Sequence, residues 1–475
     1  MTAPTNTAGG EAATTDDDRY PPSLARRDEL FRAGLLDPAE HRRRLAAHVA
    51  TVEPTVTAFV GLRPAVFADP ALPAVPSFTV KDTIDVAGYP TGLGIRSGYR
   101  REPDRSAGLV ERLTGLGWVC LGKVTTTECA LGSVKPSRNP RHPHVSTAGS
   151  STGSAVSVAA GFCDVSVGSD SGGSLRWPAV YCGVTALRLT PRPELLTGVH
   201  CVAPSMESVG FVTRTVADLD WLWRRYDLAT VTGAAAGPVP ERLRFAVSVP
   251  PDEAAHPEVA ALLDRVRAAL GAAGHRAVPV GLPDVWRQRG PAAALLAREA
   301  HDSFAALADR ADVRLGADTR AAVAHGAGID DDRYRALRRR QRVAADRVAA
   351  LLTDEYDVLL MPLETGLPDL VDAPSGGGAL PPLGGDDDGG TGVALTLVAN
   401  FARLPVLALP LALSGERSPL GVQLLAAPGA EPVLLAAGRL LESLAEAGRF
   451  EGPAGSVHPV PAGTNDERRT CRADR

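Results

Sequence analysis

The chain has 475 residues, of which 44% are hydrophobic, so it is long enough to bury a large core. Its formal net charge of −5 argues against a general nucleic-acid-binding protein, since such proteins carry an excess of basic side chains. No apolar run reaches the roughly 18 residues of a membrane-spanning helix. We therefore expect neither a nucleic acid nor a membrane as a partner.

In chain order, the sequence predicts a disordered tail over 1–20, a single folded domain over 21–455 and a second disordered tail over 456–475. The first 18 residues are polar and acidic, unlike a signal peptide, so we expect a cytoplasmic protein. Between residues 22 and 62, leucines recur at helical spacing and predict two helices.

The middle of the chain alternates short strands with helices. The runs FTVKD, WVCLGKV and DVSVGSD read as strands, and a helix is expected over 153–160. Further on, RLRFAVSV, a helix over 257–273 and HRAVPVG form a strand–helix–strand unit. This alternation predicts an α/β fold with a mixed sheet covered by helices.

Residues 284–355 are expected to be mostly helical and to cover the site. Within them, Arg333–Arg342 is a basic run that we interpret as a solvated helix face. The stretch 373–392 is rich in glycine, proline and aspartate, and a loop of this length is typical of either a lid or a plain insertion. The sequence does not distinguish between these two.

The cysteine pattern points away from disulfides and metals. The sequence contains no C-x-x-C pair, so we expect neither a disulfide framework nor a zinc site. We expect no metal and no cofactor. The six cysteines are Cys120, Cys129, Cys163, Cys182, Cys201 and Cys471.

Two glycine-flanked serine clusters stand between residues 149 and 174. The second, Ser171-Gly172-Gly173-Ser174, is expected to form a turn whose backbone N–H groups point at one spot, as an oxyanion hole requires. Ser174 closes this turn and is the candidate nucleophile. Two serines and a lysine are enough to build a nucleophile and its base without a histidine.

Lys81 is the candidate base, at the end of the strand-like run PSFTVKD. Apolar residues alternate before it, as in a buried strand, and burial lowers the pKa of a lysine by disfavouring its ammonium form. A surface lysine at a strand end is the alternative. Asp170 and Arg176 flank the serine turn, where we expect them to hold the loop by charge-assisted hydrogen bonds outside the catalytic set.

The first serine cluster also fits G-x-S-x-G, the nucleophile elbow of α/β-hydrolases, with Ser151 as nucleophile. That fold needs an acid and then a histidine further along the chain. The lysine-based scheme is favoured over the elbow. No supporting motif surrounds any of the downstream histidines, which are His200, His256, His275, His301, His325 and His458.

Several segments in the expected order resemble the amidase signature family, whose members cleave amides with a serine, a cis-bonded serine and a lysine. VKDTIDVAG matches the family's lysine segment, and GSDSGGSLRWPAVYCGV matches its nucleophile segment nearly residue for residue. GKVTTTECALGS and PSRNPRHP lie between them, and the closing elements are RYRALRRR, YDVLLMPLETG, NFARLPVLALP and LGVQLLAAP. The implied fold is a large mixed twisted β-sheet covered by helices on both faces.

The resemblance also implies roles for individual residues. It places a cis peptide between Gly149 and Ser150, and the 24 residues from Ser150 to Ser174 are the family's usual interval. Lys81, through Ser150, would take the proton of Ser174, which would form an acyl-enzyme. The implied activity is hydrolysis of the C–N bond of a linear small-molecule carboxamide, with a homodimer as one alternative for the oligomeric state.

Four departures from the family pattern are expected to border the pocket and leave the substrate open. Ala148 stands where the family has glycine, Thr152 stands where glycine or serine is common, Arg188–Pro193 replaces the usual lysine-proline-threonine run, and Glu207 replaces an aspartate. Two other functions stay as alternatives, of which the changed Arg188–Pro193 segment favours the first and disfavours the second. One is an acyltransferase that passes the acyl group to an amine, and the other is the glutamine-hydrolysing subunit of a tRNA-dependent amidotransferase.

Overall fold

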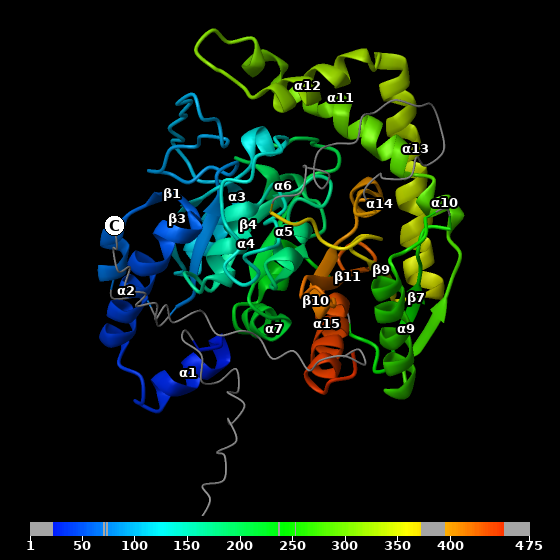
Figure 1. The fold of residues 1–475 in the computed structure, drawn as a ribbon, viewed down its shortest axis with the longest axis horizontal. Helices are drawn as coiled ribbons and strands as arrows, with labels where there is room; N and C mark the ends of the chain where they lie inside the picture. The colour runs from blue at the N-terminus through cyan, green and yellow to red at the C-terminus, as the bar shows by residue number, and fades with distance from the viewer. Residues whose placement is uncertain are drawn as a thin grey trace, which may run out of the picture.

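A mixed β-sheet crosses the molecule from left to right in Figure 1. The computed structural model describes residues 22–69, 72, 75–235, 238–251, 253–371 and 395–450, and within these ranges the sheet has eleven strands in the order β1-β3-β2-β4-β6-β5-β10-β11-β9-β7-β8. The strands are β1 (Phe59–Leu62), β2 (Ser77–Lys81), β3 (Val119–Val124), β4 (Val165–Asp170), β5 (Thr185–Arg188), β6 (Ser208–Thr213), β7 (Arg244–Val247), β8 (Arg276–Pro279), β9 (Val358–Pro362), β10 (Val406–Leu413) and β11 (Pro419–Leu425).

The sheet contains two parallel parts. Strand β2 pairs in parallel with β3 and β4, and β7 pairs in parallel with β8 and β9, whereas the other neighbours are antiparallel. The predicted mixed sheet is therefore confirmed. The described α-helices are α1 (Leu24–Arg32), α2 (Pro38–Val56), α3 (Gly108–Gly115), α4 (Thr152–Ala159), α5 (Arg176–Tyr181), α6 (Pro193–Leu196), α7 (Val216–Arg225), α8 (Leu228–Thr232), α9 (Pro257–Ala272), α10 (Pro283–Trp286), α11 (Arg289–Ala308), α12 (Ala317–His325), α13 (Asp331–Ala350), α14 (Leu397–Phe401) and α15 (Glu431–Glu446).

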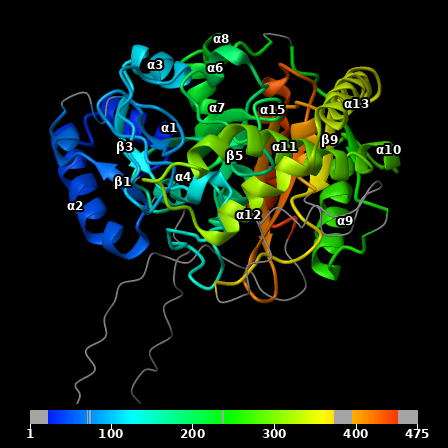
Figure 2. The ribbon, with the colours of Figure 1, turned by 90° about the horizontal axis from the view of Figure 1, so that it is seen from above.

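Helices cover both faces of the sheet, and Figure 2 shows them on either side of the strands. Leu407 and Leu409 of β10 share a core cluster with Leu434 of α15, whereas Ala408 shares a different cluster with Val180 of α5. Since successive strand residues point to opposite faces, α15 and α5 lie on opposite sides of β10. The burial of both faces explains why β9, β10 and β11 are apolar almost throughout.

Most predicted elements are found, with one correction before residue 62. The runs FTVKD, WVCLGKV and DVSVGSD become β2, β3 and β4, and the helices expected over 153–160 and 257–273 become α4 and α9. The second predicted helix, α2, ends at Val56, and Thr57 takes a left-handed φ of 51°. Phe59–Leu62 then turns away from the helix and pairs antiparallel with β3 as β1.

The predicted helical cover over 284–355 is found as α10, α11, α12 and α13, with α11–α13 at the top and right of Figure 1. It reaches the serine turn, because a Cβ added to Gly172 would come within 3.2 Å of the Leu296 side chain on α11. The basic run lies on α13, where Arg335 and Arg339 are exposed as predicted and Arg338 is half-buried against Glu299.

Some predictions lie outside the described residues: both tails, Cys471 and the 373–392 loop. The five described cysteines are free. None of the described helices is long and apolar enough to cross a membrane. Among the described residues, no group of three or more His, Cys, Asp or Glu side chains is placed to hold a metal ion.

Candidate active site

Three segments meet where β2 and β4 end. The two strands pair in parallel, so their carboxyl ends lie at the same edge of the sheet. Strand β2 ends at Lys81, and β4 ends at Asp170, directly before the serine turn. Helix α4 begins at Thr152, immediately after the first serine cluster. The fold thus brings together residues that stand about 70 and 90 positions apart in the chain.

Lys81 faces this edge because of the two-residue repeat of β2. Phe78 and Val80 point into the core, whereas the Thr79 hydroxyl lies 3.1 Å from the hydroxyl of Ser157 on α4. Lys81 shares the orientation of Thr79 and is fully buried. Its Nζ donates hydrogen bonds to Ser150 Oγ (2.7 Å) and to Ser169 Oγ (3.1 Å).

Burial shifts Lys81 toward its neutral form. It lowers the pKa of Lys81 to about 8, against the opposing charges of Glu207 and Asp170, which act to raise it. At neutral pH a larger fraction of this amine is therefore neutral, and able to accept a proton, than of the amine of an exposed lysine, and it has a hydroxyl within reach.

In the first serine cluster, the hydroxyls of Ser150 and Ser151 point to different partners. The Gly149–Ser150 peptide is cis, as the family resemblance implied, and the preceding Ala148 takes a left-handed φ of 51°, where glycine is the less strained residue. The Ser150 hydroxyl meets Lys81, whereas the fully buried Ser151 donates its hydroxyl to the Ser169 carbonyl (3.2 Å). This geometry supports Ser150, and not Ser151, as the partner of the lysine.

Ser174 lies beside this pair. Its carbonyl oxygen accepts a hydrogen bond from the Ser151 N–H (3.0 Å), which ties the serine turn to the start of α4. The Ser174 residue is partly exposed, unlike Lys81 and Ser150, which are buried. Of these three residues, Ser174 is thus the most accessible to solvent.

The predicted oxyanion donors of the serine turn need one correction. The Gly173 N–H donates to Asp170 Oδ1 (2.8 Å), so in this structure it is already used. Within the described ranges, no group accepts a hydrogen bond from the N–H of Gly172 or Ser174. Gly173 has a φ of +115°, and a Cβ at this position would come within 2.5 Å of Thr396 Oγ1. The turn therefore requires glycine at 173 for its shape and offers its donors at neighbouring positions.

A buried network of charged and amide side chains around Asp170 and Arg176 stabilises the serine turn. Arg176 and Asp170 are both fully buried and form two parallel hydrogen bonds of 2.9 Å. Asn400 donates to Asp170 Oδ1 (2.8 Å), and Arg176 donates to Gln423 Oε1 (2.7 Å). Burial acts to raise the pKa of Asp170, but the charge and hydrogen bonds of Arg176 hold it well below the usual range. The predicted ion pair is present, and its partners from the C-terminal third were missed.

Comparison with known proteins gives this arrangement a family. The family model described as Amidase matches residues 66–435. This chain belongs to the amidase family. The solved structure of 6-aminohexanoate cyclic dimer hydrolase complexed with substrate superposes with a TM-score of 0.73 at 24% identity, over 89% of this chain and 96% of the other. The predicted amidase signature fold is thus confirmed.

Two curated relatives show how the likeness is distributed. A glutamyl-tRNA(Gln) amidotransferase subunit of Nitratidesulfovibrio vulgaris is 36% identical over 41% of this chain and 42% of its own length. The 2-amino-5-chloromuconic acid deaminase of Comamonas testosteroni is 29% identical over 77% of this chain and 80% of its own length. The chain thus spans less than half the length of the amidotransferase subunit that it matches and most of the length of the deaminase.

Two of the residues that depart from the family pattern, Glu207 and Arg188, contact the serine turn or the residue directly before it. The sequence predicts them only at the border of the pocket. Glu207 accepts hydrogen bonds from the Ser171 hydroxyl (2.5 Å) and the Val202 N–H (3.0 Å), and it is buried. Burial raises the pKa of Glu207, while the Ser171 hydrogen bond and the Lys81 charge act to lower it. Arg188 is fully buried and donates to the Asp170 carbonyl (3.4 Å). The sequence pattern marked both positions but not these contacts.

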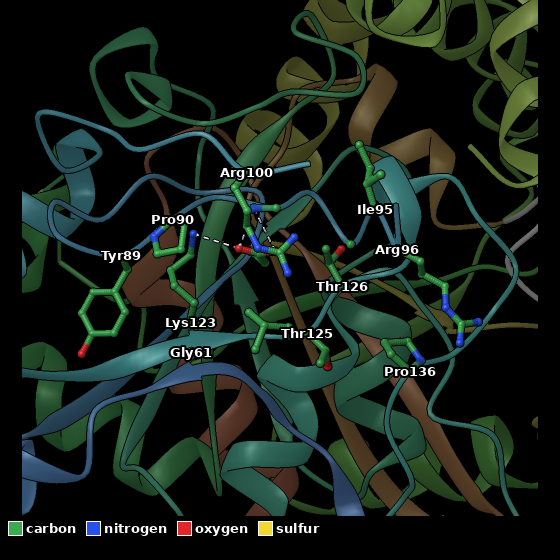
Figure 3. A pocket seen from close by; sticks show the side chains of 14 residues that line it. Gly61, Tyr89, Pro90, Ile95, Arg96, Arg100, Lys123, Thr125, Thr126 and Pro136 are labelled. Atoms are coloured by element: carbon green, nitrogen blue, oxygen red, sulfur yellow. Dashed lines mark hydrogen bonds and ion pairs between the residues drawn. The ribbon is translucent and has the colours of Figure 1, made fainter. Parts of the chain in front are cut away.

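A cavity of about 210 Å³ lies beside the sheet edge at which β2 ends in this amidase-family protein (Figure 3). It is lined by Asp82, the residue after Lys81, and by Lys123 of β3, which pair at 3.1 Å. Lys123 also donates to Thr91 Oγ1 (3.0 Å). The buried charges of Asp82 and Lys123 pair with each other, and Lys81, Ser150 and Ser174 do not line this cavity. We therefore do not assign the cavity to the candidate active site, and we interpret the Asp82–Lys123 pair as stabilising the end of β2.

Proposed function

We propose that the chain hydrolyses the C–N bond of a small carboxamide through an acyl-enzyme on Ser174. The contact that carries this proposal is the 2.7 Å hydrogen bond between Lys81 and Ser150, at a lysine whose pKa burial lowers to about 8. A buried amine with a lowered pKa that contacts the Ser150 hydroxyl can activate Ser174 through that hydroxyl, without a histidine.

The acylation step uses the three side chains in sequence. Neutral Lys81 accepts the Ser150 proton as Ser150 accepts that of Ser174, and the Ser174 oxygen bonds to the amide carbon. The N–H groups of Gly172 and Ser174, which have no acceptor among the described residues, stabilise the oxyanion that forms. The C–N bond then breaks as the proton returns through Ser150 to the leaving nitrogen, which departs as an amine or ammonia.

Deacylation repeats the same path with water. Water loses a proton to Ser150, whose own proton moves to Lys81, and its oxygen bonds to the acyl carbon. The bond to Ser174 oxygen breaks, Ser174 regains a proton, and the carboxylic acid leaves. No proton or electron is left over, so the cycle needs no co-reactant besides water.

The experiment that tests this function is labelling by a small fluorophosphonate, measured as intact-protein mass. The parent protein should gain one phosphonyl group as Ser174 oxygen displaces fluoride. Ser174→Ala should gain none. Ser151→Ala should be labelled as the parent is, because its hydroxyl is directed to Ser169 and away from Lys81. Labelling that survives Ser174→Ala and is lost in Ser151→Ala would transfer the nucleophile to the elbow serine.

The pH dependence of hydrolysis should report Lys81. Below its pKa, Lys81 is an ammonium and cannot accept a proton, so activity should rise with pH through a limb near 8. The measurement is kcat/KM for one amide between pH 5.5 and 9.5, with the parent's stability checked at each pH. A flat profile across pH 7–9 would contradict a lysine base.

The two alternative functions, acyl transfer to an amine and glutamine hydrolysis in an amidotransferase, would form the same acyl-enzyme on Ser174. The amidotransferase alternative is supported by the 36% identity to the amidotransferase subunit, although this covers only 41% of the chain. Competition between water and added hydroxylamine for the acyl group separates hydrolysis from acyl transfer. The restriction to linear amides, the oligomeric state and the cytoplasmic location stay predictions of the sequence.

A further inference from the structure

The side-chain nitrogen of Lys135 is buried. Its Nζ has essentially no exposed surface and no hydrogen-bond partner among the residues that the structure describes. The ammonium offers three donors, and burying them unpaired costs free energy. A group of this kind is typical of a site that is completed by a ligand.

The position of Lys135 places that group next to the serine pair. A Cβ added to Gly149 would lie 3.6 Å from Lys135 Nζ and 3.8 Å from its Cδ. Gly149 immediately precedes Ser150, and their shared peptide is cis. The Thr127 side chain lies at the same face of Gly149, and the Thr127 N–H donates to the Ser150 carbonyl (3.2 Å). Lys135 therefore lies against the segment that presents Ser150.

The charges around Lys135 leave its ammonium unsatisfied. Asp369 and Asp318 act on it at longer range, and neither carboxylate lies within 4 Å of Nζ in the described part of the chain. Asp318 instead accepts hydrogen bonds from the backbone N–H and hydroxyl of Ser133. Burial lowers the pKa of Lys135, and the two carboxylates oppose that change. The nearby acids thus favour the charged form without occupying its donors.

Trp177 carries a second buried donor. Its indole Nε1 has no acceptor within the described part of the chain. Trp177 lies on α5, three residues after Ser174, and packs on the apolar cluster that contains Ala148. Among the described residues, Lys135 and Trp177 thus carry buried N–H groups without an acceptor, Lys135 against Gly149 and Trp177 against the cluster that includes Ala148.

We propose that Lys135 binds a carboxylate of the substrate, so that the chain acts on amides that also carry an acidic group. This inference rests on the proposed function, since it places the acid beside the serines that would attack the amide. A carboxylate accepts charge-assisted hydrogen bonds from a lysine and would satisfy the buried ammonium. Neutral amides of the same length lack that contact and should bind more weakly.

The test uses succinamate, glutaramate and adipamate, each beside its neutral diamide, as ligands that protect Ser174 from the fluorophosphonate. We expect at least one acid to slow labelling of the parent at lower concentration than its diamide. In Lys135→Met, about tenfold to a hundredfold more acid should be needed for the same relative protection, while the diamides are unaffected. Arg138→Met, which removes an exposed cation three residues away, should keep the parent's preference.

Calorimetric titration of the same acids into Ser174→Ala separates this inference from the proposed function. If Ser174 is not labelled but the acids bind in a Lys135-dependent way, the proposed chemistry fails and the acid site stands. If Ser174 is labelled but acids and diamides protect equally, or Lys135→Met binds the acids as the parent does, the acid site is wrong and the hydrolase proposal stands. Loss of the preference in Arg138→Met as well would point to general surface charge and overturn the assignment.

Discussion

Ser174→Ala should lower kcat by on the order of 10⁴-fold or more and leave the protein folded. The substitution removes the oxygen that attacks the amide carbon in the proposed acylation step, whereas the backbone hydrogen bond from the Ser151 N–H to the Ser174 carbonyl remains. The measurement is the rate of amine or ammonia release from the best amide in a panel of carboxamides. Far-ultraviolet circular dichroism and the urea midpoint should match those of the parent.

A matched control and a graded variant sharpen this expectation. Ser154→Ala removes a buried hydroxyl on α4 that has no hydrogen-bond partner, so its activity should stay near that of the parent. Ser150→Ala removes the relay but keeps the nucleophile, and we expect a loss of about 10²–10⁴-fold. If Ser174→Ala retains activity within about tenfold of the parent while remaining pure and folded, Ser174 is not the nucleophile.

The parts of the site that could be predicted follow from local pattern. Lys81 ends a strand whose alternation dictates burial, and the run around Ser174 marks a turn through its glycines. That the two meet follows from the parallel pairing of β2 and β4, which places their carboxyl ends at one edge. The strand and the turn depend on neighbours within a few positions and are predicted by the sequence, whereas the pairing of β2 with β4 is known only from the structure.

The parts that could not be predicted depend on contacts across long stretches of chain. Asn400 reaches Asp170 across 230 residues, and no local pattern marks it as a partner. The loss of the Gly173 N–H as an oxyanion donor depends on the direction of one carboxylate. Lys135 resembles a solvated lysine in sequence, and only the packing against Gly149 reveals its buried, unpaired nitrogen. Side-chain direction and long-range packing decide all three.

Arg176→Met should reduce the free energy of unfolding by up to about 3–5 kcal/mol, because it removes the guanidinium that forms two hydrogen bonds with the fully buried Asp170 carboxylate and leaves only Arg188, at 3.7 Å, as a neighbouring opposing charge. The variant also vacates the Gln423 oxygen (2.7 Å) and the Thr396 carbonyl (3.1 Å), which Arg176 now satisfies. The measurement is urea unfolding followed by tryptophan fluorescence, where the midpoint should shift to lower urea with little change in slope.

Two further variants decide whether the position or only the charge matters. Arg176→Lys keeps the charge but cannot form two parallel bonds with Asp170, so its midpoint should fall between those of Arg176→Met and the parent. Arg335→Met breaks an exposed pair with Asp332 on α13 and should unfold as the parent does. The Gly173 N–H donates a hydrogen bond to the same Asp170 carboxylate, so a displaced carboxylate should also disturb the serine turn. The loss of stability in Arg176→Met should therefore be accompanied by a loss of fluorophosphonate labelling at Ser174. If Arg176→Met and Arg176→Lys both unfold at the parent's midpoint, the buried pair does not hold the serine turn.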